Sequence, residues 1–172
     1  IDENYPDKNL FAPISKGSKD VDLEALFKYV FFPALENFAP EALIIQAGAD
    51  MLKDDPLSRL EITNSCLWTI LSRLTLLAPK VLLTTGGGYN PWSVSRLWTG
   101  FWAIINDIDP PSGYTDEAKR LIKSLSWFRN EKVNSSLLSH LRDETVLSQI
   151  KDETLNLIKQ MNFIHKSSIQ MG

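Results

Sequence analysis

The sequence predicts an α/β fold built on a parallel sheet. Two short apolar runs, residues 42–47 and 81–85, have the length and composition of strands buried on both faces. An amphipathic helical pattern follows each run, and this strand–helix–strand–helix order predicts parallel strands with right-handed crossovers. Because two strands make an unusually small sheet, we expect an adjoining part of the sheet to lie outside this chain.

The N-terminal segment predicts an irregular lead-in followed by a helix. Residues 1–19 are rich in Pro, Gly, Asn, Asp and Lys. Ser18 or Asp20 is expected to open the helix, and Pro33 predicts a kink or an early stop. The apolar stripe of this helix consists of Leu23, Leu26, Phe27, Val30, Phe31, Ala34 and Leu35.

Two further helices are expected around the second apolar run. The first is expected to have Asn64 or Ser65 as its cap and to end at Pro79. Its apolar stripe consists of Leu67, Ile70, Leu71, Leu74 and Leu77. In the second, Pro91 occupies a plausible first helical position. Its apolar face is expected to stack Val94, Leu97, Trp98, Phe101, Trp102 and Ile105.

The C-terminal third has a different character, with more charge and no strand pattern. Residues 115–126, 135–143 and 145–162 predict helices after the Pro- and Gly-rich segment 109–113. We expect them to form a helical tail that packs back on the sheet. Residues 1–172 are thus interpreted as a single domain, with an α/β part over 1–109 and a helical tail over 110–172.

Composition excludes several classes of protein. The 172 residues carry a formal charge of −3, whereas nucleic-acid binders are usually markedly basic. No apolar run approaches the roughly 20 residues of a membrane helix, and the lone Cys66 is typical of a reducing cytoplasm. We therefore expect a cytoplasmic protein without nucleic-acid or membrane partners. Because the chain begins at Ile1 inside a loop-like stretch, we also expect it to start partway through a longer protein.

Each apolar run breaks at glycine and then presents one chemically capable side chain. Asp50 follows the first run and Tyr89 follows the second, where parallel α/β sheets form their ligand crevice. Asp50 is either a metal ligand or general base, or an Asx turn or loop cap. Tyr89 is either a hydrogen-bond donor to a developing oxyanion or a half-buried aromatic with a satisfied hydroxyl.

The remaining candidates are weaker. Gly86–Gly88 fit neither a dinucleotide fingerprint nor a P-loop, and they indicate either a tight turn or a close approach to the backbone. The two histidines, His140 and His165, both lie in the tail, so no compact zinc cluster can be identified. Cys66 lies within a predicted helix and is interpreted as structural.

Four motifs occur in a specific order along the chain: Gln46-Ala47-Gly48-Ala49-Asp50, Asp55-Pro56-Leu57, Gly86-Gly87-Gly88-Tyr89-Asn90-Pro91-Trp92 and Arg96-Leu97-Trp98. Together they resemble the histone deacetylase superfamily and, more narrowly, its acetoin utilization protein branch. The resemblance covers roughly residues 8–165. It implies an arginase/deacetylase-like three-layer α/β/α sandwich around a parallel sheet, of which this chain is the C-terminal part.

The resemblance also implies roles for individual residues. In that superfamily two aspartates and one histidine hold a catalytic zinc, and a histidine pair acts on the attacking water. Asp50 matches the last zinc-binding aspartate, and Tyr89 matches the tyrosine that stabilises the tetrahedral intermediate at the acetyl carbonyl. Leu57 matches an apolar residue at the rim of the acyl-lysine channel. The glycine loop beside that channel corresponds to Gly86, Gly87 and Gly88.

The sequence departs from the superfamily pattern in two ways. Thr85 stands where the first of four glycines is usual, which extends the strand. The histidine pair and the Asp-x-His segment are absent, because they belong to the N-terminal half of the superfamily domain. We therefore expect Zn²⁺ in the complete protein, with none held tightly by this chain alone.

The favoured hypothesis is the C-terminal part of a zinc-dependent deacetylase that hydrolyses N-acetyl-lysine-type amides to acetate and amine, inactive by itself. Its partner would be the missing N-terminal half of the same domain. A second hypothesis is a non-catalytic fragment or split-enzyme half that acts as an assembly module. A third is a deacetylase of acetylated polyamines or other small amides.

Overall fold

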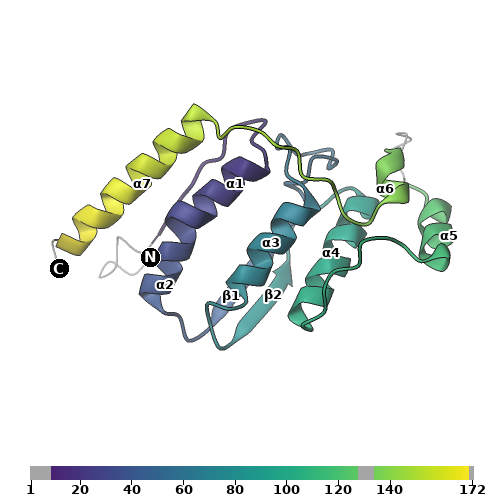
Figure 1. Ribbon diagram of the computed structural model, residues 1–172, viewed down its shortest axis with the longest axis horizontal. Helices are drawn as coiled ribbons and strands as arrows, with labels where there is room; N and C mark the ends of the chain where they lie inside the picture. The colour runs from purple at the N-terminus through teal and green to yellow at the C-terminus, as the bar shows by residue number, and fades with distance from the viewer. Residues whose placement is uncertain (1–8, 128–133, 171–172) are drawn as a thin grey trace.

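The computed structural model describes residues 9–127 and 134–170 and confirms the predicted parallel pair (Figure 1). Strand β1 (Leu43–Ala47) pairs with β2 (Val81–Thr85), and Ile45 lies opposite Leu83. Helix α3 (Asn64–Leu74) connects the two strands, and α4 (Pro91–Ile105) follows β2. The carboxyl ends of both strands therefore lie at the same edge of the sheet, which is where the candidate residues follow.

Helices cover one face of this sheet in the described part of the chain. Ile45 and Leu83 point into clusters built by the helices, whereas Ile44 and Leu82 are exposed on the opposite face. The expectation that both strands are buried on both faces is therefore wrong for the described residues. An apolar side chain on an open face is typical of a sheet that has a partner layer in the complete protein.

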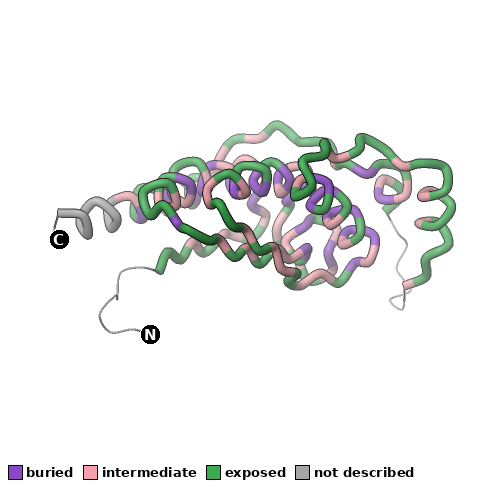
Figure 2. Tube along the Cα trace, turned by 90° about the horizontal axis from the view of Figure 1, so that it is seen from below, coloured by how far each residue is buried: buried purple, intermediate pink, exposed green. Residues whose placement is uncertain are grey.

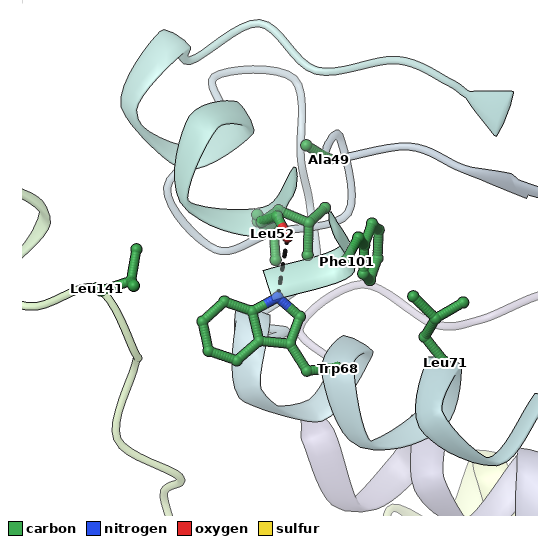
Figure 3. Packing of buried hydrophobic residues seen from close by; sticks show 7 residues of the cluster. Ala49, Leu52, Trp68, Leu71, Phe101 and Leu141 are labelled. Atoms are coloured by element: carbon green, nitrogen blue, oxygen red, sulfur yellow. Dashed lines mark hydrogen bonds between the residues drawn. The ribbon is translucent and has the colours of Figure 1, made fainter. Parts of the chain in front are cut away.

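Trp68 lies at the centre of the main apolar cluster (Figure 3). Its side chain is 3% exposed, and the indole Nε1–H donates a 3.0 Å hydrogen bond to the Leu97 carbonyl in α4. Gly100 lies directly against the indole ring, so a side chain at that position would clash with it. The close contact of α3 with α4 therefore depends on one large and one absent side chain.

The first helical segment is continuous and contains a wider turn. It comprises α1 (Asp20–Leu26), the π-helical η1 (Phe27–Phe31) and α2 (Phe32–Phe38). The Phe32 N–H donates to the Phe27 carbonyl, five residues back. Because Pro33 has no N–H and its ring would crowd the preceding turn, the wider π turn accommodates it without ending the helix. The predicted kink or stop at Pro33 is in fact this local widening.

Helix boundaries differ from the predictions where side chains from other segments intervene. Lys19 is the N-cap of α1, between the two predicted positions, and Thr63 caps α3 by accepting a 3.2 Å hydrogen bond from the Cys66 N–H. Thr63 is itself held by Asp20, which accepts from both its N–H and its hydroxyl. The prediction of Pro91 as a first helical residue is confirmed, with Asn90 as N-cap.

The C-terminal helices are shorter or displaced relative to the predictions. They are α5 (Asp116–Ser124), α6 (Ser135–Ser139) and α7 (Asp152–Gln170). No residue of α5 is buried, and Figure 2 shows this helix exposed at one end of the molecule. Within the described ranges, no helix is long and apolar enough to cross a membrane.

The tail packs on the N-terminal helices and on α4, so the expectation that it packs on the sheet is wrong. Helix α7 lies beside α1 and η1 (Figure 1). Asp22 accepts hydrogen bonds from the Lys151 N–H at 2.8 Å and from the Thr154 hydroxyl at 2.9 Å. These bonds fix the start of α7. The helix therefore begins at Asp152 and not at residue 145, where the sequence predicted it to begin.

Replacing Trp68 by Phe should destabilise the protein. The variant removes the donor to the Leu97 carbonyl and leaves a small cavity, so we expect the free energy of unfolding to fall by about 2–4 kcal/mol. Trp102 lies on α4, which packs against α3, and is 60% exposed, so it provides the matched control. Trp102→Phe should change stability by no more than about 0.5 kcal/mol in denaturant titration. Equal losses in the two variants would contradict this packing.

The charged Glu24 side chain should lower the free energy of unfolding at neutral pH. Partial burial, together with the charge of Asp20, raises the pKa of Glu24 above its ordinary value. A raised pKa means that the folded protein binds this proton more tightly than the unfolded chain does. The resulting stabilisation is fully present below the unfolded-state pKa and is lost as pH rises through the folded-state pKa. Glu24→Gln should therefore raise the melting temperature at pH 7, with the gain vanishing near pH 4. The exposed Glu41→Gln is the control, and a gain of equal size at both pH values would refute the assignment.

Candidate active site

The loops that follow β1 and β2 meet directly beyond the sheet. The Ala49 N–H donates a 2.6 Å hydrogen bond to the Gly87 carbonyl, which continues the pairing that ends at Ala47 and Thr85. A Cβ placed on Gly86 would lie 2.8 Å from the Gly48 Cα, which is too close for any side chain. Of the two interpretations of these glycines, a tight turn or a close approach to the backbone, the structure shows a close approach, and it occurs between the two loops themselves.

Gly88 cannot be replaced by a residue with a side chain, for reasons of both backbone conformation and space. Its φ is +150°, which side-chain-bearing residues rarely adopt, and a Cβ there would lie 2.9 Å from the Ala49 Cβ. This glycine immediately precedes Tyr89. The direction in which the chain enters Tyr89 therefore depends on a residue without a side chain.

The Asp50 carboxylate lies against Gly87. Its Oδ2 approaches Gly87 so closely that a Cβ there would clash with both Oδ2 and the carboxylate carbon. Asp50 is exposed and lies at the base of the loop that carries Tyr89. The structure thus brings the predicted metal ligand to the predicted glycine loop, two residues before the predicted catalytic tyrosine.

Tyr89 and Leu57 are joined through a residue to which sequence analysis gave no role. Tyr89 is 49% exposed and Leu57 is 59% exposed, whereas Asp55 is only 5% exposed. The Asp55 Oδ2 accepts a 2.6 Å hydrogen bond from the Tyr89 N–H, and its Oδ1 accepts a 2.9 Å bond from the Leu57 N–H. We call this arrangement of Asp55, Leu57 and Tyr89 the Asp55 bridge.

Asn90 makes a second link between the same two loops. Its Oδ1 accepts from the backbone N–H groups of Trp92 and Ser93, while its Nδ2 donates a 2.8 Å bond to the Asp54 carbonyl. The bond from Asp55 to Leu57, two residues on, has the spacing of an Asx turn and is a signal readable in the sequence. The bonds to Tyr89 and from Asn90 span more than 30 residues and have no local signal.

Arg96, in the last of the four motifs, binds the C-terminal tail. It is almost fully buried, and its Nη2 lies 2.7 Å from the Asp143 Oδ1 while its Nε donates to the His140 carbonyl. The backbone of the tail is thereby attached to α4. His140 itself is exposed, and the side chain of His165 lies outside the described residues.

A catalytic zinc site normally takes three protein ligands, and the described residues do not supply them. Across residues 9–127 and 134–170, no group of three His, Cys, Asp or Glu side chains is arranged to hold a metal ion. The Asp50 carboxylate is chemically suited to be one ligand of a zinc ion. Within this described part of the chain, the residues therefore do not fit a complete zinc site.

Fold and site together define an α/β protein whose candidate active site lies at the carboxyl ends of parallel strands. The family model of the histone deacetylase domain matches residues 2–105, more than half of the chain. This chain belongs to the histone deacetylase family.

Relatives and solved structures agree with this assignment. Histone deacetylase 9 of Arabidopsis thaliana is 25% identical over 92% of this chain, and human Histone deacetylase 1 is 28% identical over 88%. A crystal structure of an HDAC homologue complexed with SAHA superposes with a TM-score of 0.79 at 26% identity, over 89% of this chain. The chain spans 36% and 29% of the two relatives and 42% of that structure.

Cys66 should be unreactive in the folded protein. Burial raises the pKa of its thiol far above the ordinary value, and the charges of Asp20 and Glu24 add to the effect. Only the thiolate reacts with disulfide reagents, so Cys66 should be labelled at pH 8 only when the protein unfolds. In a Cys66→Ser/Thr69→Cys variant the thiol moves to an exposed position of α3 and should react at once. Rapid labelling of native Cys66 would contradict its burial.

Proposed function

We propose that this chain is the C-terminal part of a zinc-dependent deacetylase that hydrolyses N-acetyl-lysine-type amides to acetate and a free amine. The observation that carries the proposal is the meeting of the two loops, which places the Asp50 carboxylate against the glycine loop that leads to Tyr89. Membership of the histone deacetylase family supports the reaction class.

The residues of this chain have distinct roles in the proposal. Tyr89 donates its phenolic proton in a hydrogen bond to the oxyanion that develops on the acetyl carbonyl. Leu57 is an apolar contact at the rim of the acyl-lysine channel. The absence of side chains in the glycine loop leaves room for a slender acyl chain along the backbone, at Gly86, Gly87 and Gly88. Asp50 supplies one of three protein ligands to a zinc ion, which would polarise the amide and the attacking water.

The other zinc ligands and the histidine pair come, in this proposal, from an N-terminal half of the same domain. Two observations support such a partner. The relatives are about three times as long as the matched region, and the sheet leaves the apolar Ile44 and Leu82 exposed on one face. A layer on that face would complete the three-layer sandwich, and further strands from the same half would pair with the open edge of the sheet.

Finer assignments rest on the sequence alone. They include kinship with the acetoin utilization branch, a cytoplasmic location, and the division into an α/β part over 1–109 and a tail over 110–172.

Acetylated polyamines are an alternative substrate class, since the residues that would select them lie largely outside this chain. A non-catalytic assembly module is the alternative of a different class, and it would bind its partner through the same exposed sheet face. A coding sequence upstream of Ile1 with paired histidines and Asp-x-His supports the enzyme.

The complete protein should lose turnover when Tyr89 becomes Phe. Removing one oxyanion donor lowers kcat by about 10²–10³-fold, and an acetyl-lysine peptide assay measures it. Tyr29→Phe is the matched control, because Tyr29 is exposed to a similar extent and lies on η1. Unchanged kcat in Tyr89→Phe would remove the phenol from the mechanism.

Metal content separates the enzyme from the assembly module. The complete protein should contain one zinc per chain and lose most of it in Asp50→Asn, whereas the isolated 172-residue chain should hold no stoichiometric zinc and show no turnover. Stoichiometric zinc with turnover in the isolated chain would overturn the proposal that an N-terminal half is needed.

A further inference from the structure

The proposed function assigns no role to Asp55, although this buried carboxylate holds both loops of the site. Its two oxygens accept from two main-chain N–H groups that lie far apart in sequence, those of Leu57 and Tyr89. The 2.6 Å bond from the Tyr89 N–H is short for an N–H···O hydrogen bond.

Asp55 is itself firmly placed. Its N–H donates to the Leu52 carbonyl, and its carbonyl accepts from the Ser58 N–H, so the residue sits within a hydrogen-bonded turn. Its side chain is 5% exposed and therefore shielded from competing water. The carboxylate is a fixed point against which the neighbouring loop is held.

The loop that carries Tyr89 needs such a fixed point. Gly86, Gly87 and Gly88 precede Tyr89, and glycine restricts the backbone less than any other residue. The Tyr89 side chain is half exposed, so packing alone does not hold it. The bond at its N–H restrains the main chain directly at the residue whose phenol must be aimed.

We propose that Asp55 is a positioning residue, which sets the Tyr89 phenol and the Leu57 rim in a fixed relation by binding both main-chain N–H groups. The inference rests on the proposed function, because it assigns Tyr89 the task for which it must be positioned. Asp55 touches neither substrate nor metal in this account and acts only through the two residues it binds.

Asp55→Asn tests the idea with little change in shape. The amide offers one acceptor oxygen and one NH₂ donor, so one of the two N–H groups loses its partner. Asp54→Asn is the matched control. Among the described residues, the Asp54 side chain accepts from the exposed Asn134 and binds neither Leu57 nor Tyr89. Asp55→Glu, which keeps the charge and both oxygens, is the second variant if Asp55→Asn does not fold.

The first measurement is kinetic and uses the complete protein with an acetyl-lysine peptide. Misplacing a catalytic group by a fraction of an ångström to one ångström lowers rates by about 10- to 100-fold, so kcat should fall in Asp55→Asn with KM nearly unchanged. The same substitution in a Tyr89→Phe background should have almost no further effect on kcat. An equal fall in both backgrounds would show that Asp55 acts through general stability, and would overturn the proposal.

The second measurement does not depend on activity. Amide hydrogen exchange of the 172-residue chain should be at least tenfold faster at Tyr89 or Leu57 in Asp55→Asn than in the parent and in Asp54→Asn, with the Trp68 amide unchanged. Unchanged exchange at both residues would refute the bridge. If amide exchange becomes faster in Asp55→Asn but the complete protein shows no turnover, the proposed function fails. The positioning of Tyr89 by Asp55 then still stands.

Discussion

The hydrogen bond from the Ala49 N–H to the Gly87 carbonyl joins the two loops beyond the sheet, and the placement of the candidate site depends on it. The contact is possible only because Gly48 and Gly86 present no side chains where the two backbones approach. Parallel strands bring their carboxyl ends to one edge of a sheet, but the glycines bring the following loops into contact. Asp50 reaches the glycine loop as a result.

Buried or nearly buried aspartates connect the rest of the molecule around this contact. Asp20 binds Thr63 and so links α1 to the start of α3, while Asp22 holds the beginning of α7. Asp143 accepts from Arg96 and from the Asn64 N–H, which attaches the tail to α4 and α3. Asp55 does the same for the two site loops. Each carboxylate satisfies main-chain or side-chain donors that would otherwise be costly to bury.

Local patterns were sufficient to predict the strands, the parallel pairing and the helix beginning at Pro91, because apolar runs and proline positions act within a few residues. The same patterns failed where distant groups decide the outcome. Thr63 caps α3 because Asp20, 43 residues earlier, fixes it. The motifs named Asp50, Tyr89 and Leu57 as candidates. They gave no indication of the Asp55 bridge, because its longer hydrogen bond spans 34 residues and has no local sequence signal. Trp102 was assigned to an apolar stripe, yet its outer face meets no covering layer in the described chain.

The most direct test of this account is a measurement of the Ala49–Gly87 hydrogen bond in solution. Scalar coupling across a hydrogen bond, detected by NMR between the Ala49 amide nitrogen and the Gly87 carbonyl carbon, reports the bond itself. We expect a resolved coupling and a protected Ala49 amide. Absence of the coupling, together with amide exchange at Ala49 as fast as in an unfolded peptide, would show that the loops do not meet and that Asp50 and Tyr89 belong to no common site.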